Sequence, residues 1–243
     1  MTTGRNDVPP VAACRTSFRP VADGYVLSND LYTLYQQNRF NDTPVLVGHT
    51  SDETLAFGGP KSLSPSEFEK QVREQFGSHA GAVLAAYPHS TEAEAIRAAR
   101  HVRNETSFAW NAWTWSRQQS TVGRHPAYLY YYDNHGPQAE GAGHGSDVPF
   151  AFQTLAVRRA PSAEDQALSD KISSYFVNFA VTGNPNGKGL ERWPAFTAQG
   201  QQAMVFGSAP GARVYPMLDK VKVFDAFFEE QRKGGTGSVR DSK

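Results

Sequence analysis

A short apolar run, Val-Leu-Val at residues 45–47, restricts the fold of this sequence more than any other feature. Pro44 and Gly48 bound the run, and an apolar run of this length between turn residues is typical of a strand buried on both faces of a parallel sheet. Two further strands are predicted at residues 127–133 and 204–206, with helix-patterned segments between them. This alternation predicts an α/β fold with a mostly parallel sheet flanked by helices. In such folds the chemistry lies in loops beyond the carboxyl ends of the strands.

Helix-forming patterns and the two ends of the chain define the remaining organisation. Ser64 is placed to cap a helix, with Pro65 in its first turn and Glu67 completing a capping box. We predict helices at residues 65–76, 92–119, 163–181 and 219–232. Residues 1–16 are predicted to form a flexible tail, residues 17–232 one α/β portion, and residues 233–243 a disordered tail.

Composition argues against several classes of partner and site. Lys plus Arg and Asp plus Glu number 24 each, so there is no basic field to hold nucleic acid or an anionic membrane surface. No stretch approaches the roughly 18 apolar residues of a membrane span. The first 15 residues lack the apolar core of a secretory signal, so an export signal, if any, would lie upstream and the compartment stays open. Cys14 is the only cysteine, which excludes an internal disulfide, and we interpret it as an inert thiol.

Two loops that follow predicted strands carry the residues of chemical interest. Asp52 and Glu53 follow the first strand, and an acidic pair of this kind is most often solvated loop charge. His144 lies in a Gly-rich loop at residues 138–146, whose glycines leave an imidazole room to touch a substrate and a nucleophile. A turn histidine without a role is an equally open interpretation. An acid followed by a histidine on successive strand ends is, however, the last part of the α/β-hydrolase order Ser, Asp or Glu, His.

The remaining histidines are predicted to lie on polar faces or in loops. They occupy positions 49, 79, 89, 101, 125 and 135. Their spacings fit no standard zinc site, and the sequence has neither a CxxC nor an HExxH motif. We therefore expect no metal.

Several separated motifs resemble the carboxylesterase type B (cholinesterase-like) family. They are FRPVADG at residues 18–24, NDTPVLVG at 41–48 with the acidic pair at 52–53, AYLY at 127–130, HGSDVPF at 144–150, NFAVTGNPN at 178–186 and WPAF at 193–196. Their order and spacing match the family over about residues 17–228. The resemblance implies that the chain is the C-terminal part of an α/β-hydrolase fold, with Glu53 as the triad acid and His144 as the triad base.

Two parts of the family's active site are absent from this sequence. No G-x-S-x-G elbow, which would present the nucleophilic serine, occurs in the 243 residues, and neither does the Gly-rich stretch that forms the oxyanion hole. We therefore expect a fragment, a split subunit or a truncated gene product, which a separate N-terminal half bearing the serine would complete. Smaller departures are Thr54 in place of the usual glycine, Asp147 in place of glutamate, and Ala109 where many eukaryotic relatives have cysteine.

The resemblance implies a carboxylic ester hydrolase that acts on a small-molecule ester through a Ser-Glu-His triad and needs no cofactor. Ala56, Phe57 and Ser146 lie near enough in sequence to the acid and the base to line a substrate gorge, although a core role for Phe57 is equally open. The tryptophans at 110, 113 and 115 are assigned mainly to packing. Two alternatives are a non-catalytic cholinesterase-like binding module and an inactive truncated relic. In every case we expect the chain by itself to be inactive.

Overall fold

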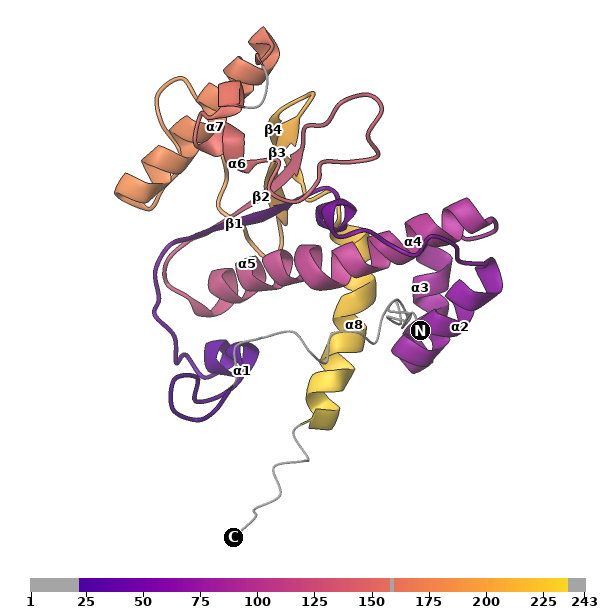
Figure 1. Cartoon of the computed structure of the whole chain (residues 1–243). Coiled ribbons are helices and arrows are strands. Elements are labelled where there is room, and N and C mark those ends of the chain that lie inside the picture. The colour runs from indigo at the N-terminus through magenta and orange to yellow at the C-terminus, as the bar shows by residue number, and fades with distance from the viewer. Residues whose placement is uncertain (1–21, 158–159, 236–243) are drawn as a thin grey trace, which may run out of the picture.

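The computed structural model describes residues 22–157 and 160–235 (Figure 1). The predicted tail at residues 1–16 and Cys14 lie outside these ranges. In chain order the helices and strands are α1 (Leu31–Gln36), β1 (Val45–Thr50), α2 (Pro65–Phe76), α3 (Ala80–Ala86), α4 (Glu92–Asn104), α5 (Trp110–Val122), β2 (Ala127–Asp133), α6 (Val148–Ala151), α7 (Ala163–Thr182), β3 (Gln202–Gly207), β4 (Gly211–Val214) and α8 (Leu218–Gly235).

The four strands form one sheet in the order β1-β2-β3-β4. β1 runs parallel to β2, and β2 runs parallel to β3, with Val45 beside Ala127 and Tyr130 beside Met204. β4 pairs antiparallel with β3 through a short hairpin. The predicted mostly parallel sheet is confirmed, whereas the antiparallel strand β4 was not predicted from the sequence.

β1 lies at an edge of the sheet formed by the described residues. Val45 is buried, but Leu46 and Val47 are only half-buried, which is less than the burial on both faces that the apolar run predicts. The reason is that β1 has a hydrogen-bonded neighbour, β2, on one side only among these residues. An apolar strand at an open edge retains pairing groups that another strand could use.

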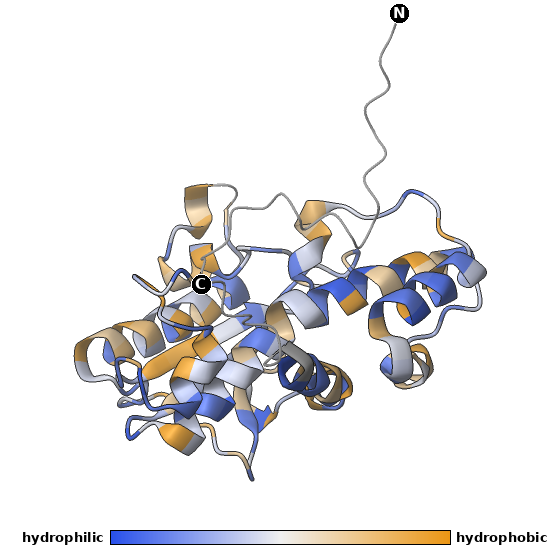
Figure 2. Cartoon of the chain, turned by 90° about the horizontal axis from the view of Figure 1, so that it is seen from below, coloured by the Kyte–Doolittle hydropathy of each residue, from blue (hydrophilic) through white to orange (hydrophobic). Residues whose placement is uncertain are grey.

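The alternating side chains of β2 divide the core between the two faces of the sheet. Ala127, Leu129 and Tyr131 pack with buried residues of α5. Tyr128 and Tyr132 point to the opposite face and pack against α7. Figure 1 shows α7 and α5 on opposite sides of the sheet, and the hydropathy colouring of Figure 2 shows hydrophobic strand residues enclosed by helices of mixed character. A third cluster joins α2, α3, α4 and α8.

The predicted helices are confirmed, with adjusted ends. Ser64 caps α2 through a complete capping box with Glu67, and α7 ends at the left-handed Gly183. The predicted helix at residues 92–119 is α4 and α5, joined without a break by a π-helical segment at Glu105–Ala109. α8 continues to Gly235, so residues 233–235 are helical although the sequence predicted a tail there.

His49 departs from its predicted place on a polar face or in a loop. It lies within β1 and is 2% exposed, with its ring against Tyr131 and Tyr215. The prediction was wrong because β1 extends three residues beyond the apolar run, to Thr50. Strand alternation therefore turns position 49 to the same face as Val45 and Val47, which is covered by α5.

The tryptophan cluster serves packing in part. Trp113, which belongs to α5, is buried in the core between this helix and the sheet. Trp110 is partly buried, and its ring nitrogen donates a hydrogen bond to the carboxylate of Asp225. Trp115 is instead half-exposed and donates a hydrogen bond to the hydroxyl of Tyr35. Only the first two thus contribute to the core as predicted.

Candidate active site

The carboxyl ends of β1 and β2 bring two loops together. The acid loop is residues 51–57, and the histidine loop is residues 138–146. The backbone N–H of Ser51 donates to the carbonyl of Tyr132 (2.8 Å), and that of Asp52 donates to the carbonyl of Ala142 (2.9 Å). Asp52 also forms an isolated parallel bridge with Gly143. The pairing of the two strands therefore continues into the loops and sets their relative position.

Glu53 and His144 face each other across these loops. Oε2 of Glu53 lies 2.5 Å from Nδ1 of His144. The other carboxylate oxygen accepts a hydrogen bond from the backbone N–H of Thr50 (2.7 Å). The backbone N–H of Glu53 donates to Oδ1 of Asn104 on α4 (2.9 Å). Glu53 is buried, and hydrogen bonds hold both its carboxylate and its backbone N–H, so it can orient the imidazole.

The hydrogen-bond partners of His144 define where its proton lies. Because a carboxylate accepts hydrogen bonds, Nδ1 carries the proton and donates to Glu53. Nε2 has no hydrogen-bond partner within residues 22–157 and 160–235, and the side chain is half-exposed. The free lone pair of an imidazole held in this tautomer can accept a proton from a nearby hydroxyl.

Two phenylalanines stand beside the imidazole. The ring centres of Phe57 and Phe108 lie 5.1 and 5.8 Å from that of His144, and their rings are nearly parallel at 6.2 Å. Phe57 is 49% exposed, which places it at the surface of the site and not in the core. Ala56, one residue earlier, is exposed as well. The site therefore offers an apolar surface next to the imidazole of His144.

Ser146 and Ser51 are the two serines nearest in sequence to the pair. The hydroxyl oxygen of Ser146 is buried and has no hydrogen-bond partner within the part of the chain that the structure describes. Ser51 accepts a hydrogen bond at Oγ from the backbone N–H of Ala142 (2.7 Å). Ser51 lies between β1 and a 3-10 helix at Glu53–Phe57, and neither serine lies in the G-x-S-x-G segment that presents a nucleophile.

Three residues that the sequence reasoning missed complete the site. Asn104 and Phe108 come from the helical segment around the π-turn, and Arg100 comes from α4, where it contacts Asp52. Their positions in the sequence carry no motif that points to the loops. They reach the site only because α4 packs against the acid loop.

Other kinds of site were sought over the described residues. They contain no group of three or more His, Cys, Asp or Glu side chains that could hold a metal ion. Within the same ranges, no helix combines the length and the apolar character that crossing a membrane requires.

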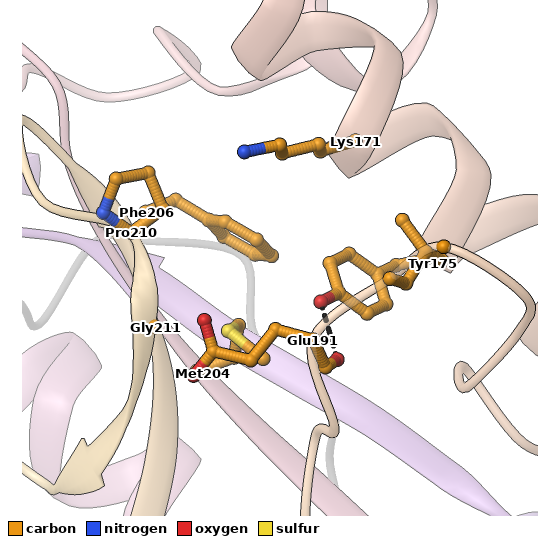
Figure 3. A pocket seen from close by; sticks show the side chains of 9 residues that line it. Lys171, Tyr175, Glu191, Met204, Phe206, Pro210 and Gly211 are labelled. Atoms are coloured by element: carbon orange, nitrogen blue, oxygen red, sulfur yellow. Dashed lines mark hydrogen bonds between the residues drawn. The ribbon is translucent and has the colours of Figure 1, made fainter.

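A separate small pocket of about 90 Å³ lies between α7 and the β3–β4 hairpin (Figure 3). Tyr175, Met204 and Phe206 form its apolar floor, and Lys171 extends over it. The carboxylate of Glu191 accepts a hydrogen bond from the backbone of β4, which ties this charge to the fold. The pocket shares no residue with the acid and histidine loops.

Comparisons with known proteins agree on one family. A family model described as the carboxylesterase family matches residues 5–222. The chain is 28% identical over 204 residues to fumonisin B1 esterase from Sphingopyxis macrogoltabida, covering 79% of this chain and 37% of that protein. It is 27% identical over 201 residues to para-nitrobenzyl esterase from Bacillus subtilis (strain 168), covering 79% and 40%.

A solved structure shares the fold. A PNB esterase structure superposes with a TM-score of 0.69 at 24% identity, covering 85% of this chain and 43% of that one. This likeness confirms the α/β-hydrolase fold. The chain thus spans roughly two fifths of the length of the relatives that it matches.

Proposed function

Because this chain belongs to the carboxylesterase family, we propose that it supplies the acid and the base of a serine-type carboxylic ester hydrolase. Glu53 is the acid and His144 is the base. The serine nucleophile and the oxyanion donors come from residues outside this chain. The observation that carries the proposal is the 2.5 Å contact of His144 Nδ1 with a buried Glu53. It leaves Nε2, on a half-exposed side chain, without a hydrogen-bond partner among the described residues.

Each half of the reaction needs two proton transfers at His144. Nε2 takes the proton of the serine hydroxyl as the serine oxygen bonds to the ester carbonyl carbon, and it returns that proton to the alcohol as the ester bond breaks. Water then attacks the acyl-serine in the same way and releases the carboxylic acid and the free serine. Glu53 remains ionised and stabilises the imidazolium that forms in each half.

The open edge of β1 is where the missing part of the enzyme would join the sheet. β1 is apolar, half-buried and paired on one side only among the described residues. A strand of an N-terminal half could pair there and continue the sheet, bringing a serine elbow to the same end as His144.

The surface beside His144 suits an ester with an apolar group. Phe57 and Phe108 offer ring faces, and Ala56 adds exposed apolar surface. The hydroxyl oxygen of Ser146 is buried, so it is not part of this exposed surface. Because relatives named for a para-nitrobenzyl ester and for fumonisin B1 share this family, para-nitrobenzyl esters and fumonisin B1 are the first substrates to test.

The test is co-expression with the N-terminal half of a carboxylesterase that bears the serine elbow. The 243-residue chain by itself should neither turn over a short-chain nitrophenyl ester nor react with a fluorophosphonate probe. The combined halves should turn over the ester and react with the probe, and the probe should label the N-terminal half. Replacing the elbow serine by alanine should abolish both turnover and labelling.

Three results would count against the proposal. Labelling of the isolated chain would show that it carries its own nucleophile. A stable complex without turnover would favour the binding module, and failure of any family half to associate would favour the relic.

A further inference from the structure

The loops that carry Glu53 and His144 are held by few direct bonds. The two residues are 91 positions apart in sequence, and the histidine loop contains Gly141, Gly143 and Gly145. Between the loops run the hydrogen bonds that join Ser51 and Asp52 to Ala142. A loop so rich in glycine needs further restraint to keep an imidazole at one position.

Arg100, from α4, reaches both loops. Its Nε lies 2.8 Å from Oδ2 of Asp52 in the acid loop. Its Nη2 contacts Oε2 of Glu140 in the histidine loop. The Arg100 side chain is 15% exposed and that of Asp52 only 2%, so the inner ion pair is shielded from water. The hydrogen bond from Arg100 is the largest cause that lowers the pKa of Glu140.

Thr54 ties the same arginine to the acid loop a second time. Its hydroxyl is placed to donate either to Oδ1 of Asp52 (3.2 Å) or to the backbone carbonyl of Arg100 (3.1 Å). Thr54 is fully buried, and it stands where the family usually has glycine. Its side chain therefore packs the acid loop onto the turn of α4 that carries Arg100.

We propose that Arg100 is a positioning residue that clamps the acid loop and the histidine loop together and so holds His144 against Glu53. This inference rests on the proposed function. The guanidinium is rigid and planar, so one side chain can lie against two carboxylates at once and fix them relative to each other. Its contact with Glu140 is a hydrogen bond, whereas its close contact with Asp52 is an ion pair in which neither Nε nor Oδ2 has hydrogen-bond geometry. Lysine, with a single ammonium on a flexible stem, cannot hold both in the same way.

Arg97 provides a matched control one turn earlier on α4. Its guanidinium lies 3.2 Å from Oε1 of Glu140, and both side chains are about half-exposed. Among the residues that the structure describes, Arg97 forms no ion pair with the acid loop. Removing Arg97 therefore removes a similar charge near Glu140 without breaking the link between the loops.

The test follows the Nδ1 proton of His144 by NMR in the 243-residue chain. A short hydrogen bond to a carboxylate moves this proton far downfield and slows its exchange with water. The wild type should show the resonance, and Glu53→Gln should lose it. Arg100→Gln should also lose it, Arg100→Lys should restore it in part, and Arg97→Gln should leave it unchanged.

Glu140→Gln keeps the inference testable if Arg100→Gln fails to fold, because Glu140 is half-exposed and only its charge changes. This variant should broaden the resonance and speed its exchange. Absence of the resonance in the wild type would reject the Glu53–His144 pair itself, and the clamp with it. A normal resonance in Arg100→Gln, or in Glu140→Gln if the former cannot be made, would overturn the clamp alone.

Catalysis in the combined halves gives a second readout. Misplacing a reacting group by about 1 Å can cost about 10²-fold in rate. Arg100→Gln should therefore lower kcat by about that factor with little change in KM, whereas Arg97→Gln should change neither. Equal kcat values for the two variants would contradict the positioning role.

Discussion

The hydroxyl of Tyr215 donates a hydrogen bond to Nε2 of His49 inside the core. Nδ1 of the same imidazole donates to the backbone carbonyl of Thr50 (2.7 Å), so both ring nitrogens of the neutral imidazole are satisfied. Burial lowers the pKa of His49 from 6.5 to about 4. A neutral histidine in the core makes the stability of the fold depend on pH.

Acid should destabilise this protein through His49. Its folded pKa lies below its unfolded value, so between pH 6.5 and 4 the unfolded state binds more protons, and stability falls as pH falls. The shift corresponds to about 3 kcal/mol once pH drops below 4. Glu105 acts in the opposite sense, since burial raises its pKa to about 8. Denaturant unfolding of wild type and His49→Gln should therefore give a stability difference that shrinks from pH 7 to pH 4, and a constant difference would refute this.

Gly48 should tolerate no side chain. A Cβ there would lie 2.4 Å from the ring of Tyr130 and 2.5 Å from its carbonyl oxygen. We expect Gly48→Ala to destabilise the fold by about 2 kcal/mol or more, because neither strand can move without breaking the ladder. Gly81→Ala in α3 is the control, since its Cβ would meet open space, and it should raise stability by up to about 1 kcal/mol. Thermal melts that rank the two variants in the reverse order would disprove this.

His144→Ala should abolish most turnover of the combined enzyme. Loss of a triad base lowers kcat by roughly 10⁴- to 10⁶-fold, and Glu53→Gln should cost less but still heavily. His135→Ala is the matched control, because His135 is exposed and pairs with Asp133 instead. Initial rates on a nitrophenyl ester check the order, and near-normal turnover by the His144 variant would reject the assignment.

The edge of β1 should make the isolated chain associate with itself. The N–H groups of Val45 and Ser51 point to β2, so strand alternation directs those of Leu46 and Gly48 to the open side. Leu46→Pro removes one of these donors, and proline is tolerated on an edge. Sedimentation should show concentration-dependent association in the wild type and less in Leu46→Pro. A clean monomer at all concentrations would argue against a free edge.

Much of the fold was predictable because local patterns agree with it. Residues close together in the sequence were enough to predict three elements: the helix that Ser64 caps, the aromatic strand β2 and the apolar strand β1. β4 was missed because its four residues have no pattern of their own and pair only through β3. The buried place of His49 was missed because the strand continued past its apolar signal.

The sequence by itself determined the family, the order of acid and histidine, and the absence of a serine elbow, because these are properties of residue type and spacing. Only the tertiary structure decided that Glu53 and His144 meet, that Phe108 and Asn104 join them, and that Arg100 reaches both loops. Each of these contacts spans dozens of residues. Such contacts depend on how the sheet sets the two loops and on how α4 packs against them, which no local pattern encodes.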